Sequence, residues 1–390
     1  MIIRQARKYR VYPTKEQERA LAIQFGHARY VYNQALARRI EHFKTTGRGL
    51  SANATIKNLT ADKQMTPWLK EADSQVLQQK LMDLDVAYRN FFQKRTRYPR
   101  FKSKRGNQTI RYPQRVKFSG TKTYLPKVGW VKTIFHRPLV GVQKSVTVSK
   151  TKTGKYFASV LCEWETEIPV NTNPSIGIDL GLTHFAILST GERFSSPRHL
   201  RKAEKRLVKV QRQLSRKRKG SANRRKARRK VARLHEHVAN QRKDFLHKLS
   251  YDITTRFGFI AIEDLNVSGM VKNHRLAKSI SDSGWSNFST MCRYKAEIRG
   301  GYVHKIERFF PSSKTCHLCG YINSDLQLSD RDWMCPECFN HLDRDVNAAI
   351  NILVHALTTA GVAESHACGE SVRPAQPMAE QAVFLETGSP

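Results

Sequence analysis

The 390-residue sequence predicts a multidomain α/β protein, in which a small β-barrel interrupted by a helical domain precedes an α/β domain with a metal-binding insert. Three observations support this prediction. Helical periodicity gives way to short β-rich runs near Tyr98. A glycine-flanked apolar strand opens a strand meander at Ile176. Two Cys-x-x-Cys pairs then interrupt the last third of the chain, before a final helix.

The charge balance of the chain is strongly basic, with 69 Lys and Arg residues against 32 Asp and Glu and a formal net charge of +37. A charge this large repels itself unless a polyanion neutralises it. We therefore expect a nucleic-acid partner, rather than a ribosome-associated or membrane-surface role. The N-terminus lacks an apolar signal core, and no stretch approaches about 20 apolar residues, so we expect a cytoplasmic protein with no membrane partner.

The N-terminal part of the chain is predicted to form one strand and then helices. Residues 2–12 have the pattern of a basic strand. A capping-box pattern that opens at Thr14 predicts a helix start at Lys15. Apolar residues at helical spacing predict two further helices, at about 27–43 and 70–93.

The middle and the end of the chain contain several predicted strands. From Tyr98 to about Glu167, β-rich runs at 145–149 and 156–162 alternate with turn signals, which is typical of a small barrel. A polar linker at 170–175 follows. The remaining predicted elements are antiparallel strands near 176–181, 185–189 and 193–194, a strand at 259–262, a helix at 286–299, a strand at 302–306 and a last helix at 344–359.

A strongly basic helical stretch covers residues 198–250. Its part from 198 to 243 holds 20 Lys and Arg residues against two acids, and apolar residues at heptad spacing flank a turn at 217–223. The pattern predicts an antiparallel helical hairpin whose basic faces contact a nucleic-acid backbone without reading sequence. The residues expected to make these contacts are Arg216, Lys217, Arg218, Lys219, Arg224, Arg225 and Lys226.

Four cysteines form two Cys-x-x-Cys pairs, Cys316 with Cys319 and Cys335 with Cys338, separated by fifteen residues. This spacing is typical of a four-cysteine zinc site, in which the thiolates complete the tetrahedron and leave no open position. We therefore expect a structural Zn²⁺ ion rather than disulfides or free thiols. His317 is then not needed as a ligand.

Carboxylates occur at the ends of predicted elements. Asp179 and Glu263 end apolar strands, and Asp343 and Asp345 begin the last helix. Each alone has an ordinary explanation as a solvated strand end or a helix cap. Together they follow the order in which an RNase H-like sheet would supply ligands to two Mg²⁺ ions. Magnesium prefers such oxygen ligands, and a pair of these ions can cleave a phosphodiester.

Several short motifs extend the pattern over nearly the whole chain. They are Tyr12-Pro13-Thr14, Tyr98–Lys102, Leu125–Trp130, Gly177–Gly181, Gln241–Lys248, Ile262–Leu265, Ser279–Asp282 with Gly284-Trp285, Phe310–Ser313, the two cysteine pairs and Asp343–Ala349. In this order they resemble TnpB, the family of RNA-guided nucleases carried by bacterial insertion-sequence transposons and related to type V CRISPR effectors.

The resemblance implies an RNase H-like (RuvC) nuclease whose catalytic, magnesium-binding residues are Asp179, Glu263 and Asp345. It also implies a monomeric ribonucleoprotein, associated with the bacterial nucleoid, that holds a guide RNA drawn from the transposon end. Its target is double-stranded DNA beside a short motif that the N-terminal domains read. Side chains near 51–54 and 74–78 are candidates for reading this motif, and Gln78 has the chemistry to contact adenine.

The sequence leaves two alternative functions open. One is a DDE-type transposase, whose carboxylates would run Asp, Asp, Glu rather than Asp, Glu, Asp. The other is a non-catalytic nucleic-acid-binding regulator, which needs no converging carboxylates.

The resemblance also implies a division of the chain into domains. The implied domains are 1–13 (first strand of a wedge β-barrel), 14–97 (helical recognition domain), 98–170 (rest of the barrel), 171–310 (RuvC-like domain with the basic hairpin), 311–340 (zinc-ribbon insert that binds target nucleic acid), 341–363 (last RuvC segment) and 364–390 (disordered tail).

Overall fold

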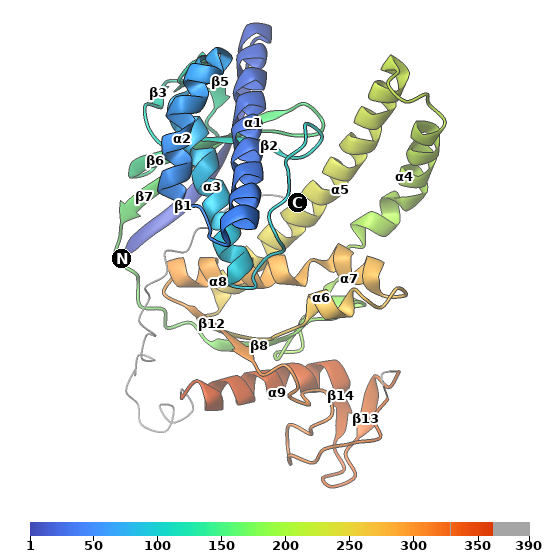
Figure 1. The fold of residues 1–390 in the computed structure, drawn as a ribbon. Coiled ribbons are helices and arrows are strands. Elements are labelled where there is room, and N and C mark those ends of the chain that lie inside the picture. The colour runs from blue at the N-terminus through green and yellow to red at the C-terminus, as the bar shows by residue number, and fades with distance from the viewer. Residues whose placement is uncertain (328, 362–390) are drawn as a thin grey trace. The chain divides into compact units, whose positions relative to one another are not determined.

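The computed structural model describes residues 1–327 and 329–361 (Figure 1). The disordered tail predicted at 364–390 lies outside these described residues. Internal contacts divide the chain into an N-terminal unit, Met1–Thr166, and a C-terminal unit that begins at Glu167. Each unit has its own sheet and its own hydrophobic core.

The N-terminal unit contains a seven-stranded antiparallel sheet of order β2-β6-β7-β1-β5-β4-β3. The first strand of the chain pairs with β7 on one side and with β5 on the other, so it lies at the centre of the sheet. The strands are β1 (Ile2–Tyr12), β2 (Gln108–Tyr112), β3 (Lys117–Ser119), β4 (Lys122–Leu125), β5 (Gly129–Ile134), β6 (Val142–Lys150) and β7 (Tyr156–Glu165).

Hydrogen bonding leaves this sheet open. Its edges are β2 and β3, and among the described residues no strand pairing joins them, so the predicted barrel is not closed by hydrogen bonds. The β3 edge is short, with three residues in β3 and four in β4, so it presents few backbone groups with which another strand could pair.

The helices of this unit are α1 (Lys15–Thr46), α2 (Ala52–Met65), the 3₁₀ helix η1 (Pro67–Glu71) and α3 (Ser74–Phe92). The start of α1 at Lys15 is as predicted, because Thr14 and Gln17 form the capping box. However, α1 continues through Gly26, where the sequence predicts two helices. The cost of a helical glycine, about 1 kcal/mol, is offset by the burial of Phe25 and Ala28 beside it.

One core holds the sheet and the helices of this unit together. Its buried residues come from β1, α1 and α3 as well as from the later strands, and Tyr9, Leu36, Leu77 and Tyr112 are all fully buried. The helices therefore cover one face of the sheet, as Figure 1 shows. The opposite face of the sheet remains outside this core.

The C-terminal unit contains a five-stranded sheet of order β10-β9-β8-β11-β12. The first three strands form the predicted antiparallel meander, and β11 and β12 run parallel to β8. The carboxyl ends of β8 and β11 therefore meet at one edge of the sheet. The strands are β8 (Ser175–Asp179), β9 (His184–Leu188), β10 (Arg193–Ser195), β11 (Phe259–Glu263) and β12 (Tyr302–Ile306).

Between β10 and β11 lies the predicted basic hairpin, formed by α4 (His199–Ser215) and α5 (Ala222–Arg256) (Figure 1). Leu207, Leu234 and Val238 are buried at the predicted apolar positions. The other elements of this unit are α6 (Val267–Met270), α7 (Ala277–Ser283), α8 (Trp285–Ile298), the two-stranded ladder of β13 (Asp332–Met334) and β14 (His341–Asp343), and α9 (Arg344–Thr359).

No helix in the described part of the chain is both long enough and apolar enough to cross a membrane.

Candidate active site

The three predicted catalytic carboxylates lie on three elements of the C-terminal unit. Asp179 is the last residue of β8 and Glu263 is the last residue of β11. Since these strands are parallel neighbours, their carboxyl ends bring the two side chains to the same edge. Asp345 lies in the first turn of α9, which packs against β8, β9 and β11.

A close contact between α9 and β8 depends on Gly177. A Cβ atom at this position would lie 2.0 Å from the carbonyl oxygen of Ala349 and 2.8 Å from Cβ of Leu353. No side chain fits in this gap, so glycine lets the helix lie directly on the strand. Because Asp179 is two residues further along β8, the same contact sets the distance between β8 and the helix that carries Asp345.

The pKa of Asp179 reflects the negative charges of the other two carboxylates. Burial, together with the negative charges of Glu263 and Asp345, raises the pKa of Asp179 to about 8. Burial also raises the pKa of Glu263, although the Ser312 hydroxyl donates to its Oε1 at 2.9 Å and opposes the shift. A buried carboxylate whose pKa is raised by neighbouring negative charges is a candidate ligand for a cation, although the nearby Arg344 acts on this pKa in the opposite direction.

Two guanidinium groups lie beside Asp345. Arg331, just before β13, and Arg344, at the start of α9, each approach an Asp345 oxygen at 3.3 Å. The neighbouring Asp343 has another role, since its Oδ1 accepts the Val346 N–H at 2.8 Å and caps α9. Its other oxygen accepts from Arg193 at 2.5 Å. The position of Asp343 before the last helix indicated the cap in the sequence. No sequence pattern indicated that the two arginines and Ser312 contact the carboxylates.

The donor set suits Mg²⁺, because all three side chains offer carboxylate oxygens. The carboxylates are not gathered around one point, however. Within residues 1–327 and 329–361, the only group of three or more His, Cys, Asp or Glu side chains close enough to share an ion is the four cysteines. Asp179, Glu263 and Asp345 are thus within electrostatic range, and they would have to move closer to hold ions together.

The raised pKa of Asp179 predicts a pH dependence of stability in buffer without added Mg²⁺. An unfolded Asp titrates near pH 3.9, whereas the folded carboxyl titrates near 8, so the folded state binds the extra proton between these values. This contribution to stability is complete below about pH 4 and is lost as the pH rises to 8. We expect Asp179→Asn to gain stability over the parent from pH 5 to 8, in denaturant titrations at each pH. A pH-independent difference would contradict the shift.

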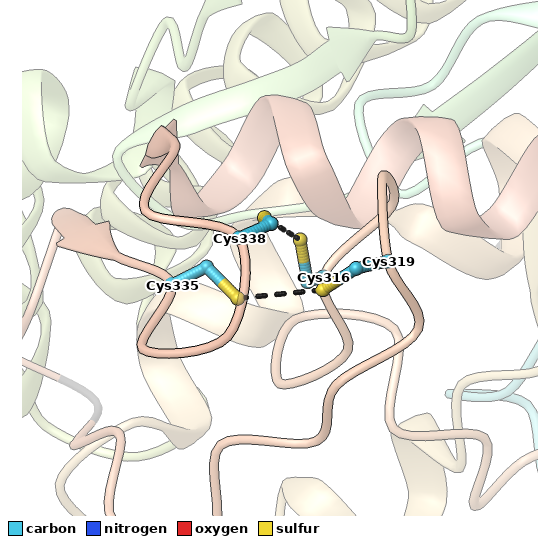
Figure 2. Close-up of side chains that lie close together, drawn as sticks. All are labelled: Cys316, Cys319, Cys335 and Cys338. Atoms are coloured by element: carbon cyan, nitrogen blue, oxygen red, sulfur yellow. Dashed lines mark hydrogen bonds between the residues drawn. The ribbon is translucent and has the colours of Figure 1, made fainter.

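The four predicted zinc ligands come together in the insert that precedes α9 (Figure 2). The sulfurs of Cys316 and Cys338 are 3.7 Å apart, those of Cys319 and Cys335 are 3.5 Å apart, and all four lie within 4.8 Å of one another. A tetrahedron with Zn–S bonds of about 2.3 Å has edges of about 3.8 Å, so the fit is close. Disulfide bonding would require about 2.05 Å.

The zinc-binding loop is attached to α9 by two buried asparagines one helical turn apart. Asn347 accepts the His317 N–H at 3.0 Å and donates to the Thr315 carbonyl at 2.7 Å. Asn351 donates to the same carbonyl at 2.6 Å. His317 is therefore outside the cysteine cluster, although it helps to dock the loop. The i, i+4 spacing of the two asparagines on an otherwise apolar helix face was the signal available in the sequence.

We expect Cys316→Ser to lose its zinc and to melt at a lower temperature, because the remaining three thiolates cannot close the tetrahedron. The checks are metal analysis of the purified protein and thermal unfolding. Cys292→Ala is the matched control, since Cys292 is fully buried in a different core and lies outside the cluster. This control should lose stability and keep its zinc. Zinc content equal to that of the parent in Cys316→Ser would exclude this cysteine as a ligand.

The residues predicted to contact nucleic acid lie in both units. Arg216, Lys217, Arg218 and Lys219 are exposed at the turn between α4 and α5, and Arg225 and Lys226 are exposed in the first turn of α5. Arg224 differs, because its guanidinium donates to the Leu214 and Lys217 carbonyls and so holds the turn. Gln78 is exposed on α3 in the N-terminal unit.

Three family models match parts of the chain. Residues 159–274 match the model OrfB_IS605, described as "Probable transposase". Residues 285–352 match the Cas12f1-like TNB domain. Residues 1–48 match a model described as a helix-turn-helix domain. In this chain that segment contains one strand, β1, followed by one long helix, α1, so it does not form a helix-turn-helix.

Relatives match over nearly the whole chain. A Streptomyces pristinaespiralis protein named "Putative RNA-guided DNA endonuclease" is 42% identical, and the match covers 95% of this chain and 92% of that one. An Escherichia coli K12 protein, "Putative RNA-guided DNA endonuclease InsQ", is 37% identical, with 97% of each chain covered. Among solved structures, the cryo-EM structure of the Cas12f1-sgRNA-target DNA complex has a similar fold, with a TM-score of 0.56 at 15% identity, covering 90% of this chain and 98% of that one.

Proposed function

This chain belongs to the TnpB (OrfB_IS605) family, and from that premise we propose that it is an RNA-guided DNA endonuclease encoded by a transposon. We further propose that the enzyme is a metal-dependent nuclease of the RuvC type and that it cuts DNA next to a short adjacent motif. The observation that carries it is the placement of three carboxylates on the neighbouring elements β8, β11 and α9, where burial and the negative charges of Glu263 and Asp345 raise the pKa of Asp179.

The arrangement of the sheet supports an RNase H-like nuclease domain. Its order, with a three-strand antiparallel meander followed by two parallel strands, brings Asp179 and Glu263 to adjacent strand ends. The carboxylate order along the chain is Asp, Glu, Asp, which differs from the Asp, Asp, Glu of a DDE-type transposase. A purely regulatory binding protein would have no need for buried carboxylates at adjacent strand ends.

In this proposal Asp179, Glu263 and Asp345 hold two Mg²⁺ ions. The chemistry expected of such a pair is generation of a water nucleophile and stabilisation of the leaving oxygen. The protein contributes the positions of the ligands. Ser312 orients Glu263 through its hydrogen bond, and Gly177 lets α9 bring Asp345 close to β8. Arg331 and Arg344 hold Asp345 and partly neutralise its charge.

The proposed partners are a guide RNA from the transposon end and a double-stranded DNA target, bound by one copy of the protein in the bacterial cytoplasm at the nucleoid. The basic hairpin supports a backbone contact, since exposed cations such as Arg216, Arg218 and Arg225 lie at and beside its turn. The helical part of the N-terminal unit, with Gln78 exposed on α3, is the proposed reader of the adjacent motif. The zinc insert is the proposed contact for target nucleic acid.

The experiment that tests this function is cleavage of a target duplex by the chain loaded with its RNA, with the carboxylate variants in parallel. Cleavage that needs Asp179, Mg²⁺ and the RNA together supports the proposal. RNA binding without any cleavage under these conditions would favour the non-catalytic regulator instead.

A further inference from the structure

Asp282, near the end of α7, contacts both helices of the basic hairpin at its base (Figure 1). One of its oxygens, Oδ2, accepts the Leu200 N–H of α4 at 2.9 Å, and the other, Oδ1, accepts from the Arg242 guanidinium of α5 at 2.7 Å. The side chain of Asp282 is 10% exposed and that of Arg242 is 25% exposed, so both charges are largely shielded from water. Such charges depend on each other, because a shielded charge that loses its partner finds little water to replace it.

The start of α4 depends on this contact because its own N-cap residue does not cap it. That residue, Arg198, has a left-handed backbone with φ of 48°, and its side chain makes no capping hydrogen bond. A Ser, Thr or Asp at an N-cap would accept one of the free N–H groups of the first turn. Here a carboxylate from another helix accepts the Leu200 N–H, and its negative charge suits the positive end of the helix dipole. The position of α4 is therefore tied to α7.

The loop that follows Asp179 meets the same junction. Leu182 and Thr183 of this loop line a cavity of about 130 Å³, and Asp282 lines it as well. The start of α4, the linker before it and α7 form the other walls. Leu180, which follows Asp179 directly, is buried in a hydrophobic core to which α5 and α7 also contribute. The base of the hairpin, α7 and the loop after Asp179 are thus packed against one another.

We infer that Asp282 is a positioning residue for the proposed cleavage, which holds the base of the hairpin against the loop after Asp179 and so keeps Asp179 in place. The inference rests on the function proposed above for Asp179. Asp282 acts through α4 and α5, and it is not itself a ligand in this account. Removing a group that orients a metal ligand typically lowers metal affinity or activity about 10–100-fold, so the expected effect is measurable.

The first test is hydrogen–deuterium exchange of the full-length protein, which needs no cleavage. Asp282→Ala removes both contacts, whereas Asp282→Asn keeps an acceptor for the Leu200 N–H and removes only the charge. We expect faster exchange than in the parent at residues 180–183 and in the first turn of α4, with Asp282→Asn between Asp282→Ala and the parent. Exchange in the sheet of the N-terminal unit should be unchanged. Parental exchange at residues 180–183 in both variants would overturn the inference.

The second test separates positioning from stability and from RNA binding. Protein loaded with its guide RNA cleaves a target duplex in single turnover at a series of Mg²⁺ concentrations. For Asp282→Asn the Mg²⁺ concentration at half-maximal rate should rise roughly tenfold, while guide-RNA affinity stays within about twofold of the parent. A loss of stability alone would not move this midpoint. An unchanged midpoint, or a loss of RNA affinity that accounts for the slower cleavage, would overturn the inference. Absence of cleavage by the parent would instead contradict the proposed function, and the exchange measurement would still decide the inference.

Further variants in the same titration test the contact itself. Arg242→Gln should reproduce the Mg²⁺ shift, and Arg242→Gln combined with Asp282→Asn should be no worse than either change alone, because both remove one ion pair. Lys278→Gln is the matched control, since the ion pair of Lys278 with Glu204 also joins α7 to α4 but both side chains are exposed. This control should keep the Mg²⁺ midpoint of the parent. Additive losses in the double variant, or an equal shift in the control, would contradict the role of Asp282.

Discussion

Replacing Asp179 with asparagine is expected to reduce DNA cleavage by about a thousandfold or more, the range seen when hydrolases lose a catalytic group. Asparagine has the same shape, but it carries no negative charge and is a poor ligand for Mg²⁺. Binding of the guide RNA should be unchanged, because the carboxylate faces Glu263 and Asp345 rather than the basic hairpin. The measurement is single-turnover cleavage of a target duplex, with RNA binding measured on the same preparation.

The matched control for this experiment is Asp264→Asn. Asp264 follows Glu263 directly, but its carboxylate pairs with Lys305 and Arg308, which lower its pKa, so it is committed to these cations. Cleavage should remain within a few-fold of the parent. Full activity in Asp179→Asn would remove this residue from the active site, whereas loss of RNA binding together with cleavage would indicate misfolding.

Gly177→Ala should strongly destabilise the C-terminal unit. The new Cβ would overlap the backbone carbonyl of Ala349, which cannot move without displacing α9 from β8. Overpacking of this kind costs about 1–3 kcal/mol, and more where the obstacle is backbone. Any folded protein should also cleave poorly, because α9 carries Asp345. Denaturant unfolding measures the first effect, and single-turnover cleavage measures the second.

Gly26→Ala makes the same chemical change at a position with open space. No atom lies within 4 Å of the added methyl group in the interior of α1, so the variant should gain about 0.5–1 kcal/mol of stability. The two alanine substitutions therefore have opposite expected signs. Equal stability of Gly177→Ala and the parent would show that α9 does not lie on β8 as described.

Local patterns in the sequence were sufficient for much of the C-terminal unit. The capping aspartate and apolar face of the last helix predict Arg344–Thr359, and the strand at Tyr302–Ile306 was also predicted with the same bounds. The two cysteine pairs predicted a cluster because a zinc site depends on spacing within short turns. Each of these features is determined by residues close together in the chain.

Features that depend on distant residues were missed or only partly predicted. Helix α2 was not predicted, because only Thr55 and Leu59 are buried and its periodicity is weak. The 70–93 helix begins later, at Ser74, since Asp73 caps it. The open sheet was not predicted, because strand order depends on pairings such as that of β1 with β7, whose residues lie far apart in the chain. The contacts of Arg331 and Ser312 with the carboxylates join residues 14 and 49 positions apart, and no local pattern encodes them.

The central claim, that a bound RNA selects the DNA to be cut, is tested most directly by exchanging the guide. The protein is produced with its native flanking DNA, the RNA that copurifies is sequenced, and its variable end is replaced by two unrelated guides. Each complex is then offered both matching duplexes with Mg²⁺. We predict that each complex cuts only the duplex that matches its guide, and that Asp179→Asn cuts neither. Cutting of both duplexes regardless of guide, or by protein without RNA, would contradict the account.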